Sequence, residues 1–307
     1  MKLHLIYLTI LLAFNITVSG QTPKDRQKVS DHLQDISVTI KSEGKYSKSE
    51  GSGVLVTRTI DDSNVTFVWT CGHVVRNLRK VKTVIASGKT IKKVEFGDVQ
   101  IVKELVENGR RVGEVKMDAT VLKYSDADDG QDLALLMVRS RDYGKAGARF
   151  YLDTETPIIP IGTPLFHVGS LLGQLGANSM TSGIISQVGR IRFKVEYDQT
   201  TVTAFPGSSG GGVYLEDGRY IGMIVRGAGE GFNLMVPIRR MISWAKEHDI
   251  MWAIDPSVEA PTLKDIESLP IESVSGDSDS SSDGNDKAFP YLIRVTNQSL
   301  INIQGKF

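Results

Sequence analysis

A succession of short apolar segments, about ten residues apart, most constrains the fold of this chain. Between residues 36 and 236 these segments are rich in β-branched residues and bounded by Gly, Ser, Asp or Asn. Many short strands at such spacing indicate an antiparallel sandwich or barrel. Asn108-Gly109, between two of the segments, is a strong hairpin signal. The sequence therefore predicts an all-β fold.

The two ends of the chain differ from this central region. Residues 1–20 look like a secretory signal, because a basic Lys2 precedes an apolar stretch that ends in small residues. An uncleaved membrane anchor is the alternative, and the polar Asn15 within the stretch favours cleavage. After the strands, apolar positions at helical spacing predict a helix over 237–248.

These signals divide the chain into a signal over 1–20, a strand-rich domain over 21–250 and a tail over 251–307. Within the tail, 273–286 is rich in Ser and Asp, and we expect it to be disordered.

Charge and cysteine content exclude several function classes. The chain of 307 residues has 36 basic and 36 acidic side chains, so nothing favours binding to nucleic acid or to an anionic membrane. After signal cleavage, no remaining stretch is apolar enough for stable membrane insertion. The single cysteine, Cys71, has no intrachain disulfide partner, and we interpret it as a buried packing residue.

A glycine-rich run over 205–214 contains the strongest chemical signal, two adjacent serines at 208 and 209. Glycines let the main chain approach a substrate closely, so that backbone N–H groups donate to a developing oxyanion. A serine in such a loop is a candidate nucleophile. A glycine-rich hairpin loop without chemistry is the alternative, and a base and an acid elsewhere in the chain decide between the two.

One histidine stands at a position suited to a general base. His73 ends the apolar segment over 68–75, where a buried strand turns into a loop. His167 lies within an apolar strand and is interpreted as a core residue, whereas His4, His32 and His248 lie in the signal or in polar segments.

The candidate acid is Asp132. It leads directly into the apolar segment over 133–138, so its carboxylate is placed at the edge of a core. We interpret Asp126, Asp128 and Asp129 of the same loop as a solvated cluster. A carboxylate at the edge of the core is suited to orienting an imidazole.

The order His73, Asp132, Ser209 resembles the serine peptidases of the chymotrypsin fold, and in detail their HtrA-like, or Deg, branch. Five motifs, spread over roughly 36–245, carry this resemblance: Gly51-Ser52-Gly53-Val54, Thr70-Cys71-Gly72-His73-Val74-Val75, Asp132-Leu133-Ala134-Leu135-Leu136, Thr181-Ser182-Gly183-Ile184-Ile185-Ser186 and Pro206-Gly207-Ser208-Ser209-Gly210-Gly211. The resemblance implies two six-stranded β-barrels, roughly 36–140 and 155–236, with the site between them and a helix after the second.

The resemblance also implies a role for each residue. Ser209, directly before Gly-Gly, is the nucleophile rather than Ser208; His73 is the base and then the acid, and Asp132 orients it. The N–H groups of Gly207 and Ser209 form the oxyanion hole. This chemistry uses neither a metal nor a cofactor, and we expect none.

A specificity pocket follows from the same resemblance. One wall contains Thr203 and Ala204, and the other contains Val225 and Gly227, with Gly231 near the closing strand. Thr203 stands where trypsin-like members have an aspartate, so the pocket is expected to be open and neutral and to accept Val, Ala, Leu or Thr. An inward-turned Glu230 would supply a negative charge instead.

The leading function is therefore a secreted or periplasmic serine endopeptidase that cleaves unfolded or loosely folded polypeptides. A catalytically inactive binding protein of the same fold and an esterase that uses the same triad are the alternatives. Most relatives carry a PDZ domain, which does not fit in the roughly 60 residues after the helix. The residues between His73 and Asp132 are also more numerous than in most relatives, and 95–116 is expected to form an extra hairpin.

Overall fold

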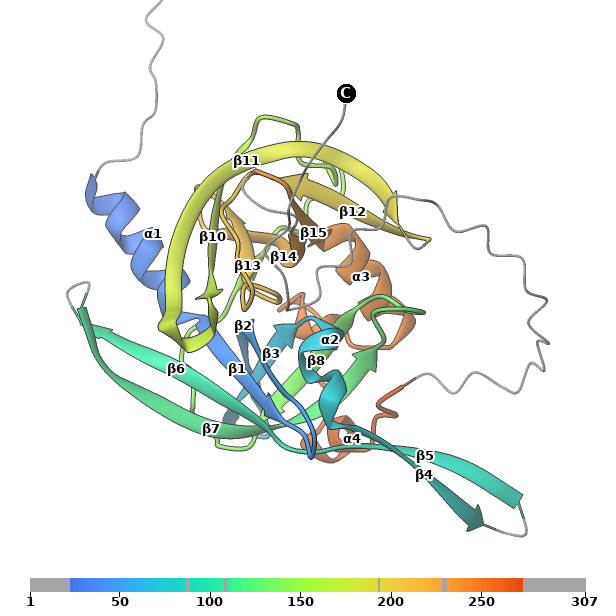
Figure 1. Cartoon of the computed structure of the whole chain (residues 1–307). Helices are drawn as coiled ribbons and strands as arrows, with labels where there is room; N and C mark the ends of the chain where they lie inside the picture. Colours follow the sequence, from blue (N-terminus) through green and yellow to red (C-terminus); the bar gives the residue numbers. More distant parts are fainter. Residues whose placement is uncertain (1–22, 87–88, 108–109, 193, 228–230, 273–307) are drawn as a thin grey trace, which may run out of the picture. The chain divides into compact units, whose positions relative to one another are not determined.

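The computed structural model describes residues 23–86, 89–107, 110–192, 194–227 and 231–272. The predicted signal, Glu230, Asn108-Gly109 and the Ser/Asp-rich run 273–286 lie outside these residues. The fold is mostly β, as the spacing of the apolar segments predicts, and its strands form two barrels (Figure 1).

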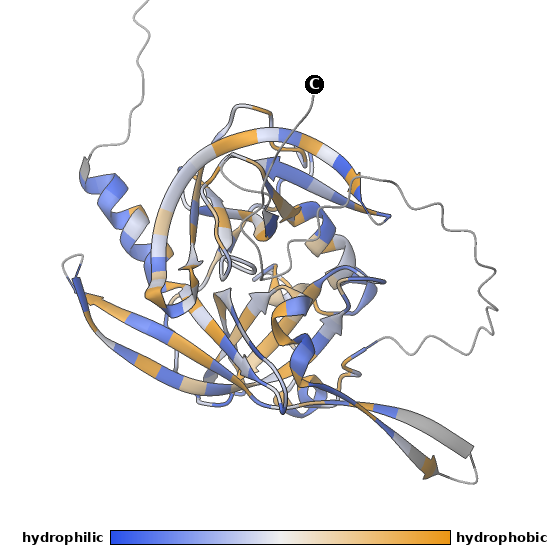
Figure 2. Cartoon of the chain, in the orientation of Figure 1, coloured by the Kyte–Doolittle hydropathy of each residue, from blue (hydrophilic) through white to orange (hydrophobic). Residues whose placement is uncertain are grey.

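The first barrel is closed by six antiparallel strands in the order β1-β2-β3-β8-β7-β6. These strands are β1 (Ser37–Glu43), β2 (Lys48–Ile60), β3 (Ser63–Thr70), β6 (Val99–Glu107), β7 (Arg110–Ser125) and β8 (Leu133–Val138). β8 is buried along its whole length, which explains its unbroken run of apolar residues. Figure 2 shows apolar and polar residues alternating on the longer strands, the pattern of a sheet with one face in the core.

The second barrel is a sheet in the order β13-β10-β11-β12-β15-β14-β9, and a further β13–β14 pairing closes six of its strands into a ring. Its strands are β9 (Arg149–Phe150), β10 (Pro164–Leu171), β11 (Gly176–Arg192), β12 (Val195–Thr200), β13 (Gly212–Leu215), β14 (Arg219–Gly227) and β15 (Asn233–Pro237). The short β9 pairs in parallel with β14. The chain is thus a chymotrypsin-like double barrel.

Two hairpins extend the first barrel. β4 (Arg79–Ala86) and β5 (Lys89–Phe96) form a separate two-stranded sheet that projects from the body (Figure 1). β6 and β7 pair as far as Glu107 and Arg110, on either side of the Asn-Gly signal. The extra hairpin expected over 95–116 is therefore made by the outer parts of β6 and β7.

Helices cover the ends of the barrels. They are α1 (Pro23–Asp35), α2 (Gly72–Val75), α3 (Ile238–Glu247) and α4 (Leu263–Glu267), with 3-10 turns η1 (Arg76–Leu78), η2 (Gly173–Leu175) and η3 (Met251–Ala253). α3 begins one residue after Pro237, whose extended backbone makes it the N-cap. The predicted helix over 237–248 is thus present and one residue shorter at each end.

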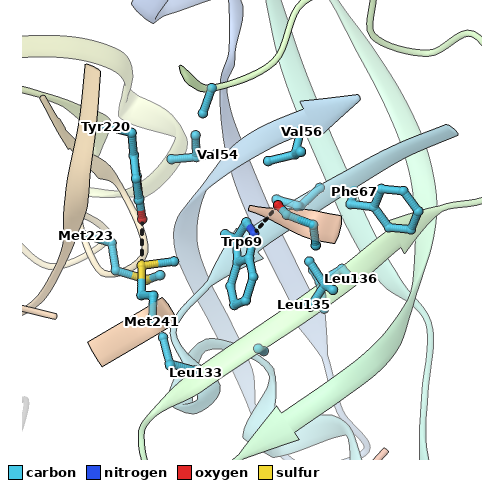
Figure 3. Packing of buried hydrophobic residues seen from close by; sticks show 14 of the residues in the cluster. Val54, Val56, Phe67, Trp69, Leu133, Leu135, Leu136, Tyr220, Met223 and Met241 are labelled. Atoms are coloured by element: carbon cyan, nitrogen blue, oxygen red, sulfur yellow. Dashed lines mark hydrogen bonds between the residues drawn. The ribbon is translucent and has the colours of Figure 1, made fainter. Parts of the chain in front are cut away.

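The tail expected over 251–307 begins with residues that belong to the core. Trp252 is 2% exposed and packs edge-to-face on Phe67, with ring centroids 4.8 Å apart. The indole N–H of Trp69 donates to the carbonyl of Ala253 at 3.1 Å (Figure 3). Because these apolar residues complete the first barrel, residues 251–272 fold against it instead of extending into solvent.

Candidate active site

The candidate base lies on the turn that follows β3. The chain leaves the barrel at Cys71 and enters α2, which presents His73 with 33% of its side chain exposed. Gly72 has no room for a side chain, because a Cβ there would lie 2.3 Å from the carbonyl oxygen of Ser125. The close approach of these two segments brings α2 to the loop that contains Asp132.

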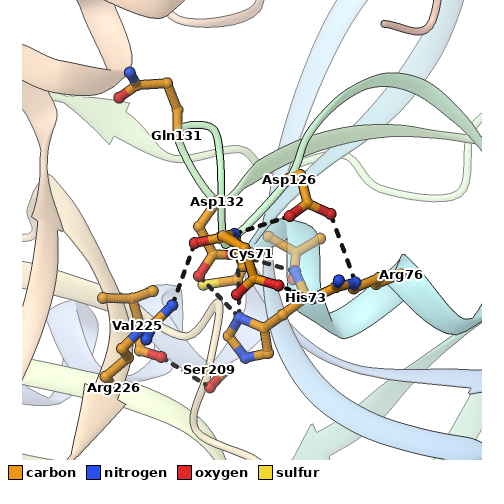
Figure 4. A network of polar contacts seen from close by, with 12 residues as sticks. Cys71, His73, Arg76, Asp126, Gln131, Asp132, Ser209, Val225 and Arg226 are labelled. Carbon is orange, nitrogen blue, oxygen red and sulfur yellow. Dashed lines mark hydrogen bonds and ion pairs between the residues drawn. The ribbon is translucent and has the colours of Figure 1, made fainter. Parts of the chain in front are cut away.

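The Asp132 carboxylate contacts His73 at two groups, the backbone N–H and the ring nitrogen Nδ1. Oδ1 accepts from the His73 backbone N–H at 2.9 Å, and Oδ1 and Oδ2 lie 3.1 and 3.0 Å from ring Nδ1 (Figure 4). Since an ionised carboxylate only accepts, Nδ1 carries the hydrogen and Nε2 is left as an acceptor. The predicted base and acid are therefore brought together in the arrangement that a general base requires.

Asp132 is held in place by its own backbone and by burial. Its φ is 53°, a left-handed conformation, and its N–H donates to the carbonyl of Asp126 at 3.0 Å. Burial alone would raise the pKa of this carboxyl, but the charge and hydrogen bonds of His73 outweigh it and hold the pKa below its ordinary value. The carboxylate is thus ionised at neutral pH.

In the loop before Asp132, Asp128 and Asp129 are exposed, as expected of a solvated cluster, whereas Asp126 is not. Asp126 is half-buried and accepts from the Tyr124 hydroxyl at 2.8 Å and from the Asp128 N–H at 2.8 Å. Arg76 pairs with both acids, at 3.5 Å to Asp126 and 2.7 Å to Asp128. Arg76 follows α2 directly, so the loop and the helix that hold the acid and the base are tied together.

Ser209 lies on the opposite side of the His73 ring from Asp132 (Figure 4). Its hydroxyl points to the carbonyl oxygen of Val225 at 3.4 Å, and no hydrogen bond to His73 is formed within the described part of the chain. A looser contact of this kind is common in free enzymes and tightens when substrate binds.

The neighbouring Ser208 has a structural contact. It is 1% exposed, and its hydroxyl accepts from the Phe205 N–H at 3.1 Å, while its own N–H donates to the Phe205 carbonyl at 2.9 Å. These two bonds close the turn that precedes Ser209.

Two backbone N–H groups of this loop have no acceptor among the described residues, those of Gly207 and Ser209. Gly207 has a φ of 98°, and a Cβ there would lie 2.3 Å from the carbonyl oxygen of Ser170, so only glycine fits. The predicted oxyanion donors are therefore free to bind a ligand.

Ser52 on β2 fixes this loop, a contact that sequence reasoning missed. Its hydroxyl donates to the Gly207 carbonyl at 2.7 Å and accepts from the Ser170 N–H at 2.7 Å. Its backbone N–H donates to the Ser209 carbonyl at 2.7 Å. The Gly51-Ser52-Gly53-Val54 motif was the available signal for this contact. The motif lies on β2 of the first barrel, whereas Ser170 and Gly207, which the Ser52 hydroxyl contacts, belong to the second.

A second backbone contact orients the peptide between Pro206 and Gly207. The N–H of Leu172 donates to the Pro206 carbonyl at 2.8 Å. In a trans peptide the carbonyl and the next N–H point in opposite directions, so this bond turns the Gly207 N–H away from Leu172. Leu172 itself has a φ of 61°.

His167 is a core residue, as expected, and it packs against Gly211 and Gly212, which directly follow the loop that contains Ser209. It is fully buried, its Nδ1 lies 3.0 Å from the Gly212 carbonyl oxygen, and a Cβ at Gly211 would lie 2.7 Å from its ring. Burial lowers the pKa of His167 to about 4. The ring is therefore neutral at neutral pH.

We expect His167 to make folding stability depend on pH. Between pH 6.5 and 4 the unfolded chain binds a proton that the folded protein does not, so stability is kept above pH 6.5 and falls as the pH drops. The loss is about 2–3 kcal/mol by pH 4.5. Urea unfolding at pH 7.5 and 4.5 measures it, with His167→Asn as control because His32 and His248 also have lowered pKa values. Equal losses in wild type and variant would contradict the role of His167.

Of the predicted pocket residues, Val225 is in direct contact with Ser209. Val225 is buried, and its carbonyl oxygen accepts from the Ser209 hydroxyl. Thr203 and Ala204 are partly exposed on one segment, and Gly227 is exposed at the end of β14. Gly231 has a φ of 75°. Glu230, the candidate source of a negative charge, lies outside the described residues.

Cys71 is buried, as expected of a packing residue. Its sulfur lies 3.8 Å from the Met223 sulfur and 3.3 Å from the Ile224 carbonyl oxygen. Burial raises the pKa of the thiol well above its ordinary value, so it stays protonated and unreactive.

Within 23–272 without its gaps, no group of three or more His, Cys, Asp or Glu side chains is placed to hold a metal ion. None of the helices there is long and apolar enough to cross a membrane.

A family model described as "Trypsin-like peptidase domain" matches residues 51–223, more than half of the chain. The chain therefore belongs to the trypsin-like peptidase domain family. Two curated relatives, both named "Serine protease Do-like HtrA", come from Lactococcus lactis strains of subspecies cremoris and lactis. They are 29% and 28% identical over 191 residues, which is 59% of this chain and 38% of each relative. The chain thus spans about two fifths of their length.

Solved structures show the same fold. A serine endoprotease from Yersinia pestis superposes with a TM-score of 0.52 at 19% identity, covering 75% of this chain and 68% of that one. An HtrA-type protease crystallised with a tripeptide gives a TM-score of 0.51 at 19% identity, covering 73% and 63%. At this identity the likeness concerns the fold alone.

Proposed function

We propose that this protein is a serine endopeptidase in which Ser209, His73 and Asp132 act as one unit. The observation that carries the proposal is the Asp132 carboxylate on Nδ1 of His73, 3.0 Å away, with Ser209 on the other side of the ring. The family of the chain supports the same reaction class.

In the proposed mechanism, the Ser209 hydroxyl attacks the carbonyl carbon of a peptide bond while Nε2 of His73 takes its proton. The ionised Asp132 stabilises the imidazolium that forms. The negative charge on the former carbonyl oxygen is bound by the N–H groups of Gly207 and Ser209. His73 then protonates the leaving amine, and a water molecule repeats the sequence on the acyl-enzyme to release the second product.

Removing one oxyanion donor from such a site typically costs about 100- to 1000-fold in turnover. The contacts of Ser52 and Leu172 with the Gly207 region therefore support the proposal, because they hold both donors in place before substrate binds.

For the substrate class we propose unfolded or loosely folded polypeptides, and for the location the periplasm or the outside of the cell. The apolar N-terminal stretch with small residues at 18–20 supports an exported protein. The family supports polypeptide substrates.

A fluorophosphonate probe tests the proposal, since it phosphonylates, with loss of fluoride, only a serine that its own site has activated. We expect one probe per chain on Ser209, shown by peptide mass mapping, together with hydrolysis of casein. A binding protein would give no labelling, whereas an esterase would be labelled and would cleave small acyl esters but not casein. Either result would overturn the endopeptidase proposal.

A further inference from the structure

Asn233 lies between the two predicted walls of the specificity pocket. It is the first residue of β15 and is fully buried. Its Nδ2 donates to the carbonyl oxygen of Val202, on the segment that leads into Thr203 and Ala204, at 2.7 Å. Across the β14–β15 pair it stands opposite Gly227, on the other wall. A single side chain thus spans from one wall to the other.

The contact with Gly227 leaves no free space between them. A Cβ built on Gly227 would lie 2.3 Å from Oδ1 of Asn233, so a side chain at position 227 would collide with the carboxamide. The glycine at 227, which by itself suggests an open pocket, instead makes room for Asn233. Gly231 adds no wall here, because a Cβ at that position meets nothing within 4 Å.

The orientation of the carboxamide follows from its hydrogen bond. The Val202 carbonyl only accepts, so the NH₂ group faces it and Oδ1 faces Gly227. This Oδ1 is buried and has no hydrogen-bond partner among the described residues. A buried acceptor without a partner lowers the free energy of unfolding. A contribution to folding stability therefore does not explain an asparagine at this position.

We propose that Asn233 closes the specificity pocket and restricts the residue before the scissile bond to small side chains: Ala, Ser, Thr or Val. This inference rests on the proposed endopeptidase function. In this proposal the substrate side chain lies beside the partly exposed Thr203 and Ala204 and does not enter the space that Asn233 occupies. Leu, Met and the aromatic residues, which need the volume that the carboxamide fills, are excluded. The sequence pattern alone, which leaves the pocket open, admits Leu.

The experiment compares cleavage profiles of full-length wild type, Asn233→Gly and Asn178→Gly on one peptide library. Asn178 is a matched control, since it is another buried asparagine of the second barrel with an unpartnered Oδ1. Its φ of 58° suits glycine. For peptides that differ only at the residue before the cut, we expect wild type to favour Ala over Leu by about tenfold or more in kcat/KM.

In Asn233→Gly the preference should reverse, with kcat/KM for Leu or Met rising about tenfold or more, while Asn178→Gly keeps the wild-type profile. A wild-type preference for Leu, Met or Phe overturns the inference even where Asn233→Gly fails to fold. An unchanged profile in a folded Asn233→Gly also overturns it. Labelling of Ser209 by the fluorophosphonate separates the two proposals. An enzyme that is labelled but prefers Leu, Met or Phe before the cut refutes only the closed pocket. An enzyme that is neither labelled nor able to hydrolyse peptides refutes both proposals.

Discussion

Ser209→Ala is expected to abolish peptide hydrolysis, whereas Ser208→Ala should keep most of it. Removing the nucleophile of a Ser-His-Asp unit costs about five to six powers of ten in kcat, because the remaining groups have no covalent route to assist. Ser208 is buried, and its hydroxyl is used by the N–H of Phe205 at 3.1 Å. Its loss removes one structural hydrogen bond, worth about 1 kcal/mol of stability. Initial rates on casein and on a fluorogenic peptide measure both effects.

The two serine variants control for each other, since they remove the same atom from adjacent residues. Far-UV circular dichroism and thermal unfolding establish that both are folded. Equal loss of activity from the two substitutions would mean that the register of the nucleophile is wrong. His73→Ala should lose about as much activity as Ser209→Ala, and combining the two should add little, as expected for residues that act as a unit.

The fold was predictable because its signal is local. β-Branched segments with turn residues at their ends predict strands wherever one face of a sheet is buried, and β6 and β7 stop on either side of the Asn-Gly pair in the sequence. The closure of the barrels, by contrast, depends on pairings such as β1 with β6 and β13 with β14, between residues distant in sequence. No periodicity encodes these pairings, so they came from the resemblance.

The residues around Asp132 show what cannot be predicted from the local sequence. Its place before the apolar β8 indicates a buried carboxylate, but its left-handed φ of 53° and the bracing of its loop by Arg76 do not follow from the residues nearby. Arg76 reaches the loop only because α2 folds back on it.

Ser52 and Asn233 were missed for the same physical reason. Ser52 acts on Gly207, 155 residues away in the chain, and both contacts of its hydroxyl are with backbone atoms, which leave no trace in the partner's residue type. Asn233 reaches the Val202 carbonyl from β15, which pairs with β12 although 31 residues separate the two positions in the chain. Ser52 also links the two barrels: the first contains the proposed base and acid, and its β2 contacts the proposed oxyanion loop of the second.

Asp132→Asn is expected to lower kcat by about ten-thousandfold with little change in KM. Asparagine keeps the shape of the carboxylate, and its Oδ1 can still accept from the His73 N–H, which is now 2.9 Å away. Its NH₂ group, however, donates to Nδ1 of the ring, which drives the hydrogen to Nε2. A protonated Nε2 cannot take the proton of Ser209, so binding survives while chemistry fails.

The matched control is Asp126→Asn, which removes a negative charge from the same loop. Asp126 contacts Tyr124 and Arg76 and does not touch the His73 ring, so we expect less than a tenfold loss of kcat, together with a small loss of stability. Steady-state kinetics on one peptide, from pH 6 to 9, compares both variants with wild type. A similar fall in kcat for the two would show that Asp132 acts through the charge of the loop and not through its bond to Nδ1. A rise in KM at constant kcat for Asp132→Asn would remove it from the chemical step.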